Sequence, residues 1–170
     1  MRRFVVILLT CCLALLVFSA TANAGAKARP FQGYVVGTCS FAPGDVTDPS
    51  PTGIWASPYG VGDVSHLGAS VMTGKHPADL TFKDGDMKLV AANGDEVWME
   101  YYGGGPTPTY IGQVYDVWIK YTIVGGTGRF ANASGSGDMT VTLTFMGFSA
   151  PPWPIVWPEV CSWRGGTIKY

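Results

Sequence analysis

The feature that most constrains the fold is a glycine-rich stretch, residues 125–137, which separates two alternating apolar runs. Its glycines are Gly125, Gly126, Gly128, Gly135 and Gly137. Because glycine accepts a positive φ and lets backbones approach closely, the stretch predicts a sharp corner between two strands. Phe130 is the one large apolar residue in this corner. We expect Phe130 to plug the end of a core.

The two runs that flank the corner have the period of β-strands. Apolar residues alternate with polar or charged ones over 115–123, and with threonine over 139–145. Period-two alternation is typical of a strand with one buried face. The inward set is expected to include Val97, Met99, Tyr115, Val117, Val141, Leu143 and Phe145. This set either lines an apolar cavity or fills the core, and the little room inside eight strands favours a filled core.

Shorter runs indicate further strands, at 31–39, 64–73, 78–82, 87–91, 96–102 and 160–170. Asp84-Gly85 and Asn93-Gly94 separate neighbouring runs, and such dipeptides are typical of tight hairpins. The prolines in 41–63 and 148–160 predict irregular loops there. About eight antiparallel strands without a helical period indicate an all-β sandwich or small barrel.

The N-terminus has the pattern of a secretory signal peptide. Arg2 and Arg3 precede an apolar segment, residues 4–18, and Ala22-Asn23-Ala24 supplies small residues at the cleavage positions. We expect cleavage after Ala24, which leaves one domain over residues 25–170 in the periplasm or outside the cell. The alternative is an uncleaved anchor, but a span needs about 18 apolar residues.

The charge of the chain excludes several partners. The formal charge is −1 overall and becomes −3 without Arg2 and Arg3, so no basic surface is expected for nucleic acid. The glycine corner leads into a strand, whereas phosphate-binding glycine loops lead into a helix. No cofactor, and no membrane span after signal removal, is predicted.

Two cysteines remain beyond residue 24, Cys39 and Cys161. In an oxidising compartment they most simply form a disulfide with each other. That bond would tie the first strand to the last, which favours a barrel over a sandwich. A catalytic thiol is the alternative, although no histidine stands near either cysteine in the sequence.

The corner also carries a family resemblance. Residues 123–130, read IVGGTGRF, with Ala133 and Gly135, resemble the GGTG-x-F-x-x-A-x-G segment of dirigent proteins and allene oxide cyclases. Residues 31–170 resemble a group of small secreted bacterial proteins of unknown function, through the segments 66–68, 91–95, 123–135 and 166–170. The resemblance implies an eight-stranded antiparallel calycin-like barrel. No catalytic residue of either enzyme family is carried over to this sequence.

The candidate site residues are few. His66 and His76 supply at most half of a metal site, and local hydrogen bonds are the favoured interpretation, so no metal-binding or catalytic residue is predicted. Aromatic residues that fall outside the apolar faces are candidates for ligand or interface contact: Trp98, Tyr102, Trp118, Trp153 and Trp157. If the strand register is shifted by one residue, some of them instead face inward.

Two functions follow from these patterns, and the resemblance implies a third. The favoured one is a non-enzymatic barrel that binds a small apolar molecule or a protein partner, as a monomer or a homo-oligomer. The alternatives are a structural or envelope-associated protein, and a dirigent-like or cyclase-like activity on a hydrophobic substrate. A dry interior would favour the structural role, and an inward charged pair would favour the enzyme.

Overall fold

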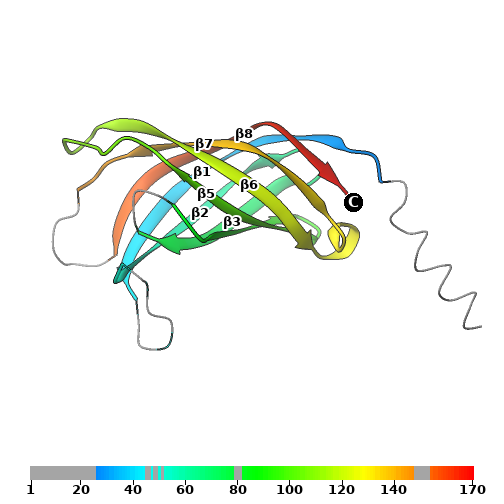
Figure 1. Ribbon diagram of the computed structural model, residues 1–170, viewed down its shortest axis with the longest axis horizontal. Coiled ribbons are helices and arrows are strands. Elements are labelled where there is room, and N and C mark those ends of the chain that lie inside the picture. The colour runs from blue at the N-terminus through cyan, green and yellow to red at the C-terminus, as the bar shows by residue number, and fades with distance from the viewer. Residues whose placement is uncertain (1–25, 45–46, 48–49, 51, 79–81, 148–153) are drawn as a thin grey trace, which may run out of the picture.

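The fold is a closed barrel of eight antiparallel strands in chain order, as Figure 1 shows. The computed structural model describes residues 26–44, 47, 50, 52–78, 82–147 and 154–170. The elements are β1 (Arg29–Pro43), β2 (Ile54–Val64), β3 (Gly68–Pro77), β4 (Gly85–Ala91), β5 (Glu96–Gly104), β6 (Val114–Gly126), the 3-10 turn η1 (Gly128–Phe130), β7 (Ser134–Thr144) and β8 (Ile155–Lys169). The predicted all-β class and strand number are confirmed. Pairing of β1 with β8 makes the fold a barrel and not a sandwich.

The alternation of apolar residues fixes the inner faces of β6 and β7. All residues predicted to face inward are buried, including Tyr115, Val117 and Leu143, while Trp118 between them is exposed. A side chain in a strand points to the face opposite its neighbours, so one apolar set lines the interior and the other residues meet solvent. The core therefore lies inside the barrel.

The proline-rich segment 41–63 differs from its prediction, because much of it is strand. β1 continues to Pro43, and β2 begins at Ile54. Pro58 lies opposite Cys39 on β1, whereas the pairing of β2 with β3 breaks off between Ala56 and Tyr59. A proline without an N–H is tolerated where a ladder is interrupted.

The segment 148–160 is also partly strand. β8 begins at Ile155, and Pro158 lies opposite Thr38 of β1. The pairing between β7 and β8 ends at Leu143 and Glu159, so Pro158 lies where β8 has only one paired neighbour. Such an edge accommodates proline. Trp153 lies outside the described residues.

The strands from β2 to β5 pair consecutively, and their limits differ from those of the predicted runs. The run expected at 64–73 is divided by a turn at residues 65–67, where His66 has a φ of 71°, and β3 starts only at Gly68. The run expected at 78–82 falls largely on residues 79–81, which lie outside the described residues. The predicted Asn93-Gly94 turn joins β4 to β5, with Gly94 N–H bonded to Ala91 O at 2.9 Å.

The glycine corner forms the connection from β6 through η1 to β7. A side chain at Gly126 would overlap the backbone oxygen of Glu96, and Gly128 has a φ of 55°. Both positions therefore need glycine. Phe130 is fully buried there, and its ring lies 4.8 Å from that of Tyr170.

The expected Cys39–Cys161 disulfide is not formed in the structure, where both are free, buried cysteines. Cys161 lies opposite Val35 on β1, and Cys39 lies opposite Trp157 on β8. An offset of four residues corresponds to roughly 13 Å along a strand. A disulfide spans a Cα separation of at most about 7 Å. The two strands do adjoin, but their register keeps the thiols apart.

Candidate functional site: the interior cavity

A cavity of about 160 Å³ lies within the barrel. It occupies the half of the barrel in which β1, β3, β5 and β7 end. The glycine corner and the C-terminal residue lie at the other end, at the right in Figure 1. The lining is mostly apolar: Cys39, Phe41, Pro58, Ala78, Phe82, Met87, Pro108, Ile119, Met139, Val141, Leu143, Trp157 and Cys161, with His76, Tyr101, Thr107, Tyr115 and Glu159 as the polar members. Three residues of the predicted inward set line this cavity, namely Tyr115, Val141 and Leu143, and the other four are buried elsewhere in the core.

Aromatic rings form one wall of the cavity. Trp157 on β8 lies with its ring 4.4 Å from that of Phe41 on β1, and 5.1 Å from that of Phe145. Trp157 is 3% exposed, and its indole N–H donates to the Gly147 carbonyl at 3.3 Å. The sequence placed this tryptophan in a loop, whereas the start of β8 at Ile155 turns it inward.

A second aromatic group surrounds His76, at the end of β3. The imidazole lies 4.8 Å from the ring of Phe82 and 5.8 Å from that of Tyr101. Its Nδ1 lies 2.9 Å from the Pro77 carbonyl oxygen, a contact in which the nitrogen must donate. His76 is therefore a buried, hydrogen-bonded residue of the cavity wall.

Glu159 is the unusual residue of the cavity. It lies on β8 between Gly37 of β1 and Leu143 of β7, and it is 4% exposed. Its Oε1 has no hydrogen-bond partner among the described residues. Burial raises the pKa of this carboxyl to about 8, because the charged form loses its hydration. At neutral pH Glu159 is mostly a neutral acid.

The two thiols and two phenols of the cavity wall are also uncharged at neutral pH, because their pKa values are raised. Burial raises the pKa of the Cys39 and Cys161 thiols well above the ordinary value, and Glu159 raises both further. The pKa of Tyr101 is raised well above its usual range by burial, and that of Tyr115 to about 12 for the same reason. Thiols with raised pKa values are weak nucleophiles, so the catalytic-thiol alternative gains no support.

Glu159 was not among the residues singled out from the sequence. The alternation Trp157, Glu159, Cys161 and Trp163 was its only signal, because it places a carboxylate in a row of inward aromatic and cysteine residues. The signal is visible only if β8 is extended back through Pro158. The predicted loop over 148–160 includes Glu159, and a loop position gives no indication that a side chain faces inward.

The outward aromatic residues do not share in the cavity. Trp98 is 42% exposed, Tyr102 57% and Trp118 64%. Trp118 on β6 pairs with Gly104 on β5, and Tyr102 precedes Gly104 by two residues. The side chains of Trp118 and Tyr102 are therefore diagonal neighbours on the outer face of β5 and β6. Trp98 lies at the far end of β5, where its indole donates to Glu96 Oε2 at 2.7 Å.

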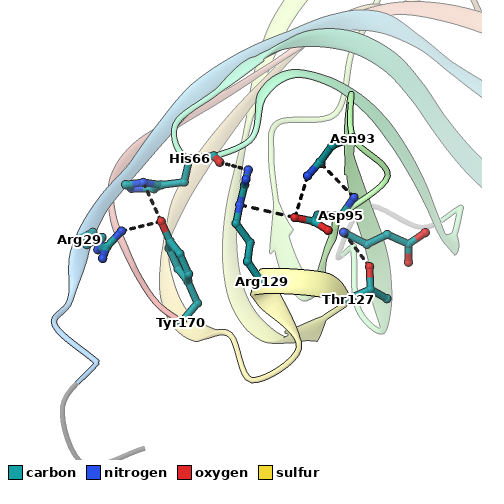
Figure 2. Close-up of polar contacts among 8 residues, drawn as sticks. Arg29, His66, Asn93, Asp95, Thr127, Arg129 and Tyr170 are labelled. Carbon is teal, nitrogen blue, oxygen red and sulfur yellow. Dashed lines mark hydrogen bonds and ion pairs between the residues drawn. The ribbon is translucent and has the colours of Figure 1, made fainter. Parts of the chain in front are cut away.

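A polar cluster at the glycine-corner end is the second candidate, shown in Figure 2. His66 Nε2 donates to the Pro30 carbonyl at 2.8 Å, which leaves Nδ1 to accept from the Tyr170 hydroxyl at 3.4 Å. Arg29 Nη1 donates to the same hydroxyl at 2.7 Å. These bonds join the start of β1, the β2–β3 turn and the residue after β8.

Arg129 extends the cluster to the corner itself. Its Nη2 donates to the His66 carbonyl at 2.6 Å, and its Nε lies 3.7 Å from Asp95 Oδ2 (Figure 2). Thr127 Oγ1 accepts the backbone N–H of Glu96 at 3.0 Å. These contacts give hydrogen-bond partners to polar groups where the turns meet. We therefore interpret the cluster as a structural one that closes the glycine-corner end of the barrel.

We next compared the described residues with known kinds of site, and the chain with known proteins. Within the described part of the chain, no three His, Cys, Asp or Glu residues gather to hold a metal ion. His66 lies in the turn before β3, and His76 lies near the far end of that strand. Among the residues that the structure describes, no helix has the length and apolar character needed to cross a membrane. Comparisons with protein families, curated proteins and solved structures found no match to this chain.

Proposed function

We propose that the barrel binds a small apolar molecule in its interior cavity. The observation that carries the proposal is the cavity itself, about 160 Å³ between apolar and aromatic side chains. A protein interior is ordinarily packed with few voids larger than a water molecule. A purely structural barrel gains nothing from such a space, because each missing contact costs dispersion energy. A space of this kind favours a binding barrel over a structural one.

The proposal places the protein outside the cytoplasm. The pattern of residues 1–24 supports export and cleavage after Ala24. The corner around Gly126, Gly128 and Phe130, which resembles that of dirigent proteins and allene oxide cyclases, supports a barrel of the calycin-like kind. Ligand binding in the mouth of a β-barrel is a common use of such folds.

The test is to fill the cavity with a larger side chain and to compare ligand binding with that of a variant that carries the same substitution on the outer surface of the barrel. Val141 lines the cavity, whereas Val36 on β1 is exposed. Val141→Phe should weaken binding of toluene at least about tenfold, measured by ligand-observed NMR, and Val36→Phe should leave it unchanged. Equal binding by both variants and the parent protein would place toluene elsewhere and remove the basis of the proposal.

One observation favours a second function, a cyclase-like conversion at the same site. A buried carboxylic acid with a raised pKa is what a general acid requires, and such groups gather at active sites. The test probes the acid-assisted opening of an epoxide that such a conversion would begin with. Glu159 would protonate the oxygen of cyclohexene oxide as a C–O bond breaks, water would add to that carbon and return a proton, and the diol would form; loss of the epoxide is followed. Loss that disappears in Glu159→Gln would support the enzyme, and an unchanged epoxide with measurable binding would support the binder alone.

A further inference from the structure

We propose that the cavity selects neutral apolar molecules that carry one hydrogen-bond-accepting oxygen, such as a carbonyl, and that Glu159 donates its carboxylic acid proton to that oxygen. This inference rests on the proposed binding function and names the chemical class of the ligand. It is carried by the position of Glu159, a cavity-lining carboxyl that is 4% exposed and has an unpartnered Oε1.

Two other polar groups of the cavity wall already have protein partners. The Trp157 indole N–H donates to the Gly147 carbonyl, and His76 Nδ1 donates to that of Pro77. A buried polar atom without a partner is costly, and such an atom in a native structure calls for an explanation. Because Glu159 lines the cavity, an oxygen of a bound ligand would supply the partner that this carboxyl lacks.

The surroundings of Glu159 favour a neutral ligand over a cationic one. The described residues that line the cavity include no lysine or arginine, and burial keeps the acid protonated at neutral pH. An ammonium ligand would need Glu159 to ionise, and both charges would then lose their hydration. The attraction within a buried ion pair often fails to repay that cost. A neutral ligand oxygen, by contrast, accepts a hydrogen bond from the protonated carboxyl, so that Glu159 need not ionise.

The size of the cavity limits the ligand. Its volume of about 160 Å³ is close to the ~150 Å³ of an engineered protein cavity that binds benzene. The ligand, or the part of it that enters the barrel, is therefore a single ring or a short branched chain. The aromatic wall of Phe41 and Trp157 suits a flat or ring-shaped body.

A matched pair of probes tests the inference. Cyclohexanone and methylenecyclohexane have the same shape and differ by a carbonyl oxygen in place of a CH₂ group. The dissociation constants of both are measured by ligand-observed NMR at neutral pH, with cyclohexylamine as a cationic third probe. We expect cyclohexanone to bind about tenfold more tightly than methylenecyclohexane, which corresponds to one hydrogen bond gained inside the protein.

Variants at Glu159 connect the preference to the carboxyl. Glu159→Met removes the donor at similar volume and should reverse the preference in favour of methylenecyclohexane, because a carbonyl buried without a hydrogen bond costs free energy. Glu159→Gln keeps an N–H donor and should retain a preference for cyclohexanone. Glu100→Gln is the control, since Glu100 is an exposed carboxyl on β5 and should leave both affinities as they are. If Glu159→Met does not fold, the parent protein and Glu159→Gln still decide the question.

The outcomes separate the inference from the function on which it rests. Binding of neither neutral probe to the parent protein would overturn the binding function and the inference together. Binding of methylenecyclohexane as tight as that of cyclohexanone would overturn the inference alone. Tighter binding of cyclohexylamine, or a cyclohexanone preference that persists in Glu159→Met, would also overturn it.

Discussion

At the scale of single residues, Glu159 is the one Asp, Glu, Lys or Arg side chain that is buried in the described part of the barrel. It lies on the inner face of β8 between Trp157 and Cys161, at a position where an apolar residue would avoid the cost of burial. The structure tolerates it by keeping it protonated, because its pKa is raised to about 8. Retaining such a residue in the cavity wall is consistent with a role in ligand recognition.

The raised pKa of Glu159 predicts a particular pH dependence of stability. The unfolded chain loses this proton near pH 4.5 and the folded chain near pH 8, so the folded state binds more protons between these values. The free energy of unfolding therefore falls as pH rises through that window and levels off above it. The full change is on the order of 5 kcal/mol.

Glu159→Gln isolates this contribution. Denaturant titrations at several pH values should show the free energy of unfolding of the variant gaining on that of the parent between about pH 4.5 and 8. The other titratable groups that interact with Glu159, Cys39, Cys161 and Tyr101, remain protonated through this window because their pKa values are raised. A constant difference between the two proteins would show that Glu159 is charged or solvated in the folded state.

At the scale of elements, the glycine corner and the β1–β8 seam decide how the barrel closes. The corner seats Phe130 against Tyr170 and brings η1 to the β4–β5 turn through Arg129 and Asp95. The seam joins the first strand to the last over twelve register pairs from Arg29 to Phe41. Neither element depends on the disulfide that the sequence suggested.

Removing the Phe130 ring tests the corner as a structural plug. Phe130 is fully buried, so Phe130→Ala should lower the free energy of unfolding by about 3–5 kcal/mol. Tyr110→Ala removes an exposed ring and should change it by less than about 0.5 kcal/mol. Equal small losses in the two variants, measured by urea denaturation, would mean that the corner does not close the core.

The state of the cysteines tests the register of the seam. Unfolding without reductant, followed by alkylation and peptide mapping, should label Cys39 and Cys161 separately, because the register holds them apart. The same reagent should leave both unlabelled in the folded protein, where burial and raised thiol pKa values suppress reaction. A cross-linked peptide recovered without reductant would contradict the described register between β1 and β8.

At the scale of the whole molecule, the sequence predicted the class of fold and the inner faces of the regular strands. β6 and β7 were recognisable because Ile119 and Val141 sit in uninterrupted alternation. β2 and the start of β8 were not recognisable, because Pro58 and Pro158 are residues that usually interrupt a strand. A strand accepts a proline where one of its neighbours does not pair with it. Which residues lack a paired neighbour is known only from the closed barrel.

The cavity was harder to foresee than the fold. Whether an inward set fills a barrel or leaves space depends on how side chains from strands distant in sequence meet. Glu159 became visible as a cavity residue only once β8 was known to start at Ile155. Cys39 and Cys161 face inward as buried residues, yet register, which no local pattern reports, sets the four-residue offset between them.

The central claim is that the barrel interior holds a small molecule, and native mass spectrometry of the protein purified from its producer tests it most directly. We predict a co-purifying neutral molecule of low mass that is lost on denaturation and is absent from Val141→Phe, in which the cavity is filled. A clean mass of the protein alone, together with failure to take up toluene when it is added, would contradict the claim and return the barrel to a structural role.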